Sequence, residues 1–312
     1  MIKPLLWAFS QGGTKGHLTV FIFHRVLSQP DELFPDEPDV SRFDEILGWI
    51  KGWFNVIPLD IAVRQLRENT LPSRAAAITF DDGYADNFTN ALPTLKKNNL
   101  CATFFIATGF LDGGKMWNDI IIESIRACQS PALDLNHLNL GTLYIGSLEE
   151  KKNTIATILA LLKYRSTAER AAMANEVANT VGVELPTNLM MTSAQVAAMH
   201  RAGMQIGAHT VSHPILSKTI PSEAKCEIAD SKTHLEQLLG ERVSLFAYPN
   251  GKAGVDFLPE HATIVRELGF DAAVTTDWGT ACQSTDLYTL PRFTPWDRSR
   301  NRFGLRLLRN LW

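Results

Sequence analysis

The chain has 312 residues, of which 45% are hydrophobic and 20% are charged, a composition typical of a soluble globular protein with a substantial core. Its 30 Lys and Arg residues are balanced by 33 Asp and Glu residues, and the formal charge of −3 argues against a nucleic-acid partner. The cysteines form no CxxC pair, which argues against a zinc ribbon or a redox dithiol. We expect all four to be reduced and mostly buried: Cys101, Cys128, Cys226 and Cys282.

The N-terminal residues 1–18 contain a short apolar patch, which Gln11, Gly12 and Gly13 interrupt too early for a secretory signal. No run in the chain approaches the ~20 apolar residues needed to span a bilayer. The sequence therefore predicts a cytoplasmic protein without a membrane-spanning segment, and it leaves the oligomeric state open.

Short apolar runs that are typical of β-strands alternate with helical segments along the chain. The predicted strands cover residues 18–24, 75–80, 102–108, 204–208, 243–247, 271–276 and, more weakly, 288–293. A helix over 41–53 is predicted to begin with a capping box of Ser41 and Asp44, and a second box pairs Thr192 with Gln195. A further helix runs from Ser222 to Gly240. Continuous apolar strands between helices indicate a mostly parallel sheet covered by helices.

The segment at about 112–191 breaks this alternation. Its residues 149–180 are rich in Ala, Leu, Glu and Lys, which predicts helices inserted into one βα connection. Such an insertion could form a lid or substrate rim, or only structural padding. The basic amphipathic tail at about 300–312 is expected to pack on the domain, with peripheral membrane association as the alternative. We expect a single domain over residues 1–312.

Two acidic residues, Asp81 and Asp82, directly follow the predicted strand 75–80 and precede Gly83. A surface turn is one interpretation, since Asp and Gly both favour turns. The other is a catalytic site, because α/β folds place their chemistry at the carboxyl ends of parallel strands.

A pair of histidines, His209 and His213, follows the predicted strand 204–208. Their spacing of four lets one helical turn or a tight loop aim both imidazoles at one point. Two His and one carboxylate form a common divalent-metal site that leaves positions open for water and substrate. Together with the acidic pair at another strand end of the same sheet, the histidines predict a metal site.

Four segments in chain order resemble the motifs of a known enzyme family. They are residues 79–83 (TFDDG), 209–214 (HTVSHP), 246–251 (FAYPNG) and 276–278 (TDW). The family is that of the polysaccharide deacetylases with a NodB homology domain, carbohydrate esterase family four. Residues 18–26 (LTVFIFHRV) also resemble the first strand of one subgroup. The resemblance and the alternation together predict an α/β fold: a distorted (β/α) barrel of about seven parallel strands with a helical insertion.

The resemblance implies a metal-dependent hydrolase that removes N-acetyl groups from an N-acetylated sugar. The carbohydrate would be a polysaccharide, an oligosaccharide or a lipid-linked precursor. By match to the family's motifs, Asp81 is the general base, and Asp82, His209 and His213 bind one divalent metal. Zinc is the default metal, and Co or Ni suit the same ligands.

The later motifs imply supporting roles. The backbone N–H of Asn250 would stabilise the oxyanion, and Tyr248 of the same motif would contact substrate. Asp277 would orient a charged neighbour. Trp278 would wall the site, although a structural tryptophan at a strand end explains it equally well.

Two departures from the family pattern stand out. Ala247 occupies the position of an arginine that holds the base, and we expect Arg292 to replace it, with Arg25 as the alternative. The histidine that acts as general acid is also missing, because no histidine follows His261. His24, at the end of the first strand, is the candidate acid, since an imidazole titrates near neutrality.

Each of these candidates also has a structural interpretation, as an ordinary ion pair or a histidine bonded to backbone. In the insertion, Trp117 and Asp119 are expected to serve core packing rather than sugar contact. Two alternative functions remain: a deformylase or amidase acting on another acylated sugar or small amide, and a carbohydrate-binding pseudoenzyme.

Overall fold

A parallel sheet that is nearly closed into a barrel forms the body of the protein, whose computed structural model describes residues 2–311. The strands lie in the order β1 (Leu18–Phe23), β3 (Ala75–Phe80), β4 (Thr103–Ile106), β7 (Gln205–Ala208), β8 (Leu245–Ala247), β9 (Ala272–Trp278) and β10 (Leu290–Arg292). A short β2 (Asn55–Val56) adds beside β3. The predicted fold class and all seven predicted strands are confirmed.

Backbone hydrogen bonds across the seam between the first and last strands nearly close the barrel. Phe293, directly after β10, donates from its N–H to the Val20 carbonyl at 2.8 Å. Ile22 in turn donates to the Phe293 carbonyl at 3.1 Å. Because of this closure, β10 lies beside β1, which in turn pairs with β3.

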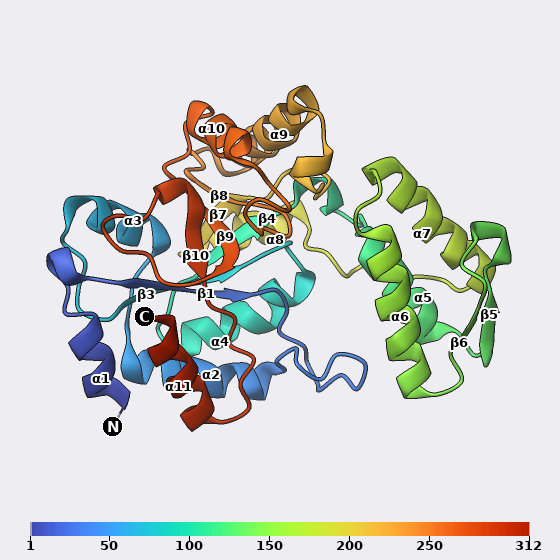
Figure 1. Ribbon diagram of the computed structural model, residues 1–312, viewed down its shortest axis with the longest axis horizontal. Coiled ribbons are helices and arrows are strands. Elements are labelled where there is room, and N and C mark those ends of the chain that lie inside the picture. The colour runs from blue at the N-terminus through green and yellow to red at the C-terminus, as the bar shows by residue number, and fades with distance from the viewer. Residues whose placement is uncertain (1, 312) are drawn as a thin grey trace.

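Helices cover the outside of the barrel (Figure 1). They are α2 (Val40–Trp53), α3 (Leu59–Glu68), α4 (Leu92–Lys97), α8 (Ser193–Arg201), α9 (Pro221–Leu239) and α10 (Pro259–Glu267). The predicted capping box of Thr192 and Gln195 is confirmed at the start of α8, and α9 ends as predicted at Gly240, whose φ is +72°. The box predicted at Ser41 is wrong, because the Asp39 side chain caps α2 by accepting from the Arg42 N–H at 2.7 Å.

Single-turn elements complete the connections. They are the 3₁₀ turns η1 (Gly13–Lys15), η3 (Thr108–Phe110), η4 (Asn136–Leu138), η5 (Leu216–Lys218) and η6 (Leu287–Thr289), and the π-helical turn η2 (Asn87–Ala91).

The strands bury both of their faces, as continuous apolar runs in a parallel sheet should. On β3, Ala75 and Ala77 belong to the core inside the barrel, while Ile78 and Phe80 join the outer core under the helices. Because side chains alternate along a strand, Asp81 continues the inward row of Ala75 and Ala77. The inward face thus carries an acid at the carboxyl end of the strand.

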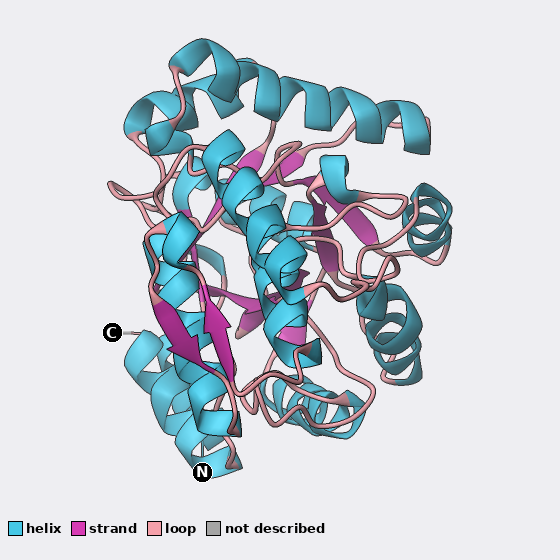
Figure 2. Cartoon of the chain, turned by 90° about the vertical axis from the view of Figure 1, so that its right-hand side faces the viewer, coloured by secondary structure: helices cyan, strands magenta, loops and turns pink. Residues whose placement is uncertain are grey.

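The insertion forms a separate lobe beside the barrel (Figures 1 and 2). It consists of α5 (Trp117–Ala127), the antiparallel pair β5 (Ala132–Asp134) and β6 (Thr142–Tyr144), α6 (Leu148–Leu162) and α7 (Thr167–Val181). These elements enclose a hydrophobic core of their own, which Leu33 and Phe34 from the loop after β1 join. The helices expected within 149–180 are present, whereas α5 and the hairpin were not predicted.

The two ends of the described chain lie side by side. Helix α1 (Ile2–Phe9) packs against α11 (Arg300–Asn310), whose Phe303 and Leu307 are buried on the barrel (Figure 1). Within residues 2–311, no helix combines the length and the apolar character that crossing a membrane requires.

The four cysteines are all free. The expectation that they are mostly buried is wrong, because only Cys128 is buried and Cys226 is exposed.

Candidate active site

The turn after β3 separates the two adjacent carboxylates. Asp82 adopts a left-handed conformation with φ of +76°, and Gly83 follows with φ of +91°. A β-carbon on Gly83 would approach Ile106 at 3.3 Å, so glycine suits both the backbone and the space. The bend turns Asp82 away from the inward row to which Asp81 belongs, and the two acids acquire different partners.

Asp81 is held by Arg292 of β10 inside the barrel. The guanidinium donates from both terminal nitrogens to the two carboxylate oxygens, each at 2.7 Å, and its Nε–H donates to the Thr275 carbonyl at 2.6 Å. Both side chains are almost completely buried. Burial alone would raise the pKa of Asp81, but the Arg292 guanidinium outweighs it and lowers that pKa below its ordinary value.

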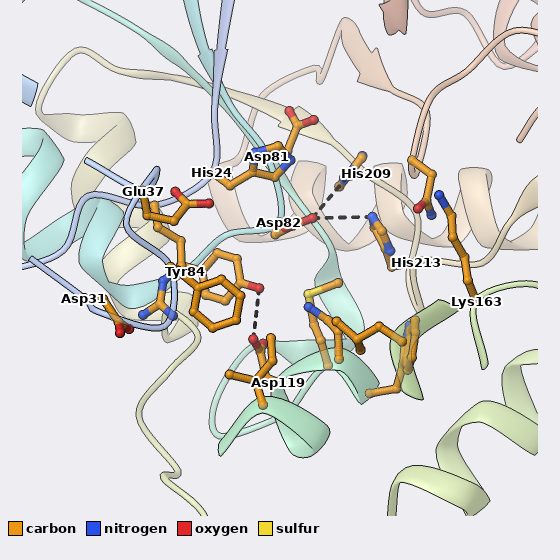
Figure 3. A pocket seen from close by; sticks show the side chains of 18 of the residues that line it. His24, Asp31, Glu37, Asp81, Asp82, Tyr84, Asp119, Lys163, His209 and His213 are labelled. Carbon is orange, nitrogen blue, oxygen red and sulfur yellow. Dashed lines mark hydrogen bonds and ion pairs between the residues drawn. The ribbon is translucent and has the colours of Figure 1, made fainter. Parts of the chain in front are cut away.

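Asp82, His209 and His213 come together at one point, and their potential ligand atoms all lie within 4.8 Å of one another (Figure 3). The Nε2 atoms of both histidines lie 3.4 Å from Asp82 Oδ1. The Nδ1–H of His209 donates to the Ala247 carbonyl at 2.7 Å, which orients the ring and leaves Nε2 for a ligand. The loop after β7 aims His213 at the same point through left-handed conformations at Thr210 and His213.

The charges of these three residues suit a cation. Burial would raise the pKa of Asp82. Its contacts with the two histidines, of which the hydrogen bond to His209 has the largest effect, instead lower that pKa well below its ordinary value. Burial lowers the pKa of His213 to about 3, so its imidazole is neutral and keeps a lone pair. For His209, the hydrogen-bonded Asp82 carboxylate outweighs burial and raises the pKa. The three side chains therefore offer one negative charge and imidazole nitrogens at a buried point.

A cavity of about 450 Å³ opens over this point, between the barrel and the insertion lobe. His24, Asp81, Asp82, His209, His213 and Asn250 line its barrel side. Figure 3 shows His24 and Glu37 next to each other on one side of Asp82, with His213 and Lys163 on the other. The cavity therefore brings the predicted base, the predicted acid and the predicted ligands to one place.

The lobe supplies the opposite wall through Trp117, Asp119 and Lys163, among others. The Tyr84 hydroxyl donates to Asp119 Oδ1 at 3.2 Å, which ties the lobe to the turn that carries Asp82. Burial raises the pKa of Asp119 to about 7, so the carboxyl is neutral over much of the acidic range. The expectation that Trp117 and Asp119 serve only core packing is thus incomplete, since both also border the cavity.

The remaining predicted residues lie in different places. Asn250 has φ of +58°, and its N–H makes no hydrogen bond to any residue within 2–311. Tyr248 lies outside the cavity lining, stacked on Phe257 with a ring separation of 3.8 Å and donating its hydroxyl to the Tyr288 carbonyl at 3.0 Å. Its side chain therefore packs the core instead of facing the metal ligands.

Two residues of the last motif also lie outside the lining of the cavity. Asp277 accepts from the Ala253 N–H at 3.1 Å, and Trp278 is half exposed. Arg25, the alternative partner for the base, pairs instead with Asp86 at 2.8 Å.

The sequence analysis did not single out Glu37, Tyr84 or Lys163, which all line the cavity. Tyr84 follows Asp-Asp-Gly by one residue, and that proximity was the available signal. Glu37 lies in the loop after β1 and Lys163 lies in the insertion, and no local sequence pattern identifies either as a site residue. Burial raises the pKa of the Glu37 carboxyl, with His24 and Arg25 acting in the opposite direction.

Comparison with known proteins agrees with this architecture. A family model described as polysaccharide deacetylase matches residues 68–127 and 148–273, more than half of the chain. The Bacillus subtilis (strain 168) protein YxkH is 20% identical over 277 residues, which cover 88% of this chain and 70% of YxkH.

Two solved structures share the fold. The deacetylase PplD of Streptococcus pyogenes, in complex with acetate, has a TM-score of 0.63 and 20% identity, covering 95% of this chain and 98% of its own. IcaB from Ammonifex degensii has a TM-score of 0.59 and 19% identity, covering 93% and 96%.

Proposed function

Because the chain belongs to the polysaccharide deacetylase family, we propose that it is a metal-dependent hydrolase that removes N-acetyl groups from an N-acetylated sugar. One observation carries this proposal: a three-residue ligand set and an arginine-held carboxylate face the same cavity. The substrate would be N-acetylglucosamine in a polysaccharide, an oligosaccharide or a lipid-linked precursor.

Asp82, His209 and His213 would hold the metal. One carboxylate and two imidazoles suit Zn, and also Co or Ni. The hydrogen bond from His209 to the Ala247 carbonyl is the outer contact that histidine ligands commonly make. When bound, the cation supplies Lewis acidity, lowering the pKa of water and polarising the acyl carbonyl.

Asp81 would act as the general base. Arg292 occupies both carboxylate oxygens with one hydrogen bond each, and every oxygen keeps a further lone pair that can accept the proton of the attacking water. The Arg292 guanidinium also lowers the pKa of Asp81, so its carboxylate is ionised at neutral pH. The base is therefore fixed in orientation and available as an anion.

His24 and Asn250 would complete the reaction. Attack of water on the acetamide carbon places negative charge on the carbonyl oxygen. Asn250 lines the cavity, and its N–H, which donates to no acceptor within residues 2–311, would stabilise that charge. The C–N bond then breaks, and His24 would donate a proton to the departing amine. Water and the amide become acetate and the free amino sugar.

The test combines metal binding with acetate release from chito-oligosaccharides. We expect Asp82→Asn to lose zinc binding in calorimetry and to lose turnover, while its unfolding transition stays cooperative. Asp277→Asn is the matched control, because the Asp277 carboxylate accepts from the Ala253 N–H and lies outside the lining of the cavity. Full activity of Asp82→Asn, or activity that chelators leave unchanged, would remove the metal from the mechanism. Binding of the glycan by wild type without acetate release would favour a carbohydrate-binding protein instead.

A further inference from the structure

A patch on the two terminal helices combines exposed apolar side chains with basic ones. Residues 2–17 and 298–311 contain Lys3, Lys15 and five arginines but no Asp or Glu, although the chain as a whole has a net charge of −3. The two segments meet in space, because α1 packs on α11 (Figure 1). Basic residues are therefore concentrated on one part of an acidic protein, where Asp36 and Asp297 pair with three of the five arginines, Arg298, Arg302 and Arg306.

Close packing fixes the two helices against each other. A β-carbon on Gly304 of α11 would lie 2.0 Å from Ile2 Cδ1, so glycine permits the contact. Ile2 and Leu6 of α1 are one turn apart, and Leu6 is fully buried. The other sides of α1 consequently face outward.

The outward sides of α1 are almost entirely apolar. Leu5 and Trp7 are 46% and 54% exposed, and Pro4 and Ala8 are exposed beside them, with Lys3 as the single charge. On α11, Leu305 is 62% exposed and shares a face with Arg302 and Arg309. Leu5 and Trp7 lie on the two flanks of the outward side of α1, with Pro4 and Ala8 between them, and together they form a wide apolar surface that is unusual where water covers it.

The cations of this patch are available to a partner. Within residues 2–311, Lys3 and Arg309 form no ion pair with any carboxylate, and Arg302 forms only a long contact of 3.4 Å with Asp297. Lys and Arg around Trp and Leu are the composition of helices that lie in the interface of a lipid bilayer. At eight residues, α1 is suited to lie in that interface and not to cross it.

We propose that the patch formed by Lys3, Leu5, Trp7, Arg302, Leu305 and Arg309 docks the protein on an anionic phospholipid surface. The apolar side chains would enter the headgroup region, and the cations would contact lipid phosphates. This proposal is independent of the reaction, because the patch contains no residue of the cavity.

Vesicle co-sedimentation of the full chain tests the docking. Wild type should bind vesicles of phosphatidylcholine with phosphatidylglycerol, bind pure phosphatidylcholine much more weakly, and dissociate at high salt. Lys3→Gln with Arg309→Gln, and separately Leu5→Ser with Trp7→Ser, should each weaken binding on the order of tenfold. Leu305→Ser is a further single substitution with the same expected direction.

Ile220→Ser with Arg201→Gln is the control, since both residues are exposed away from the patch, Ile220 directly before α9 and Arg201 at the end of α8. This double variant should bind vesicles like wild type. Acetate release and thermal unfolding should be unchanged in every variant, which separates docking from folding and from the reaction. Three results would overturn the proposal: no vesicle binding by wild type, equal binding to neutral vesicles, or a wild-type dimer that the Leu5 and Trp7 substitutions dissociate.

Discussion

Arg292 donates two hydrogen bonds of 2.7 Å to the Asp81 carboxylate, although the two residues lie 211 positions apart in the chain. The contact exists because the barrel nearly closes and places β10 beside β1, the strand that pairs with β3. It links the last strand of the barrel to the predicted base, so the closure of the fold and the position of that carboxylate depend on each other.

Replacing Arg292 by Met should leave Asp81 buried without a partner. The free energy of unfolding should fall by about 3–5 kcal/mol, the usual cost of breaking a buried pair from one side. Acetate release should fall about 10²-fold or more, because the base would lose its orientation. Urea denaturation and turnover measure the two effects. The double variant Arg292→Met with Asp81→Leu should recover part of the stability and none of the activity; if it recovers no stability, the pair is not what stabilises the barrel.

The role of His24 as acid predicts a dependence on the leaving group. His24→Gln should lower the turnover of an acetamido sugar by about 10²–10⁴-fold, since a poor amine leaving group needs a proton. An acetanilide with an electron-withdrawing ring should be affected much less, because its amine departs more easily. His17→Gln is the control, since His17 contacts Thr280 away from the cavity. Equal losses for both substrates would argue against proton donation by His24.

The buried carboxyl of Asp119 should make stability fall as the pH rises. Its pKa is about 7 in the folded protein against an ordinary 3.8, so between about pH 4 and 7 the unfolded chain ionises while the folded chain keeps the proton. Each pH unit in that window costs up to roughly 1.4 kcal/mol. Urea denaturation of metal-free protein across this range should show a difference between wild type and Asp119→Asn that grows with pH and levels off above about pH 7. A constant difference would show that Asp119 titrates normally.

Gly207 lies in β7, two residues before His209, where the barrel leaves no room for a side chain. A β-carbon there would lie 2.4 Å from Phe105 Cδ1 and 3.0 Å from the Leu245 carbonyl oxygen. Gly207→Ala should therefore cost about 1–3 kcal/mol of stability and weaken zinc binding by displacing the strand. At Gly48 of α2 nothing lies within 4 Å, and Gly48→Ala should stabilise the protein by about 0.5–1 kcal/mol. Similar melting temperatures for the two variants would contradict this account of the strand.

Local sequence patterns were enough to predict the barrel strands and a meeting point of acids and histidines. Strand periodicity, caps such as Thr192 and stops such as Gly240 depend on neighbouring residues, and these predictions are confirmed. Local rules predicted that the acidic pair and the two histidines meet, because parallel strands end at the same edge of a sheet, and the family resemblance implied Asp82 as the ligand of the pair. The cap at Ser41 failed because Asp39, two residues earlier, offers an equally good oxygen.

Only the tertiary structure decided which distant residues complete the cavity. The sequence offered both Arg292 and Arg25 as partners for Asp81, and barrel closure places Arg292 there while Arg25 meets Asp86. The same holds for the lobe, where Asp119 reaches Tyr84 across the cavity. The physical reason is that hydrophobic periodicity reports which side of an element is buried, whereas the partner of a buried charge depends on the packing of elements that are far apart in the chain.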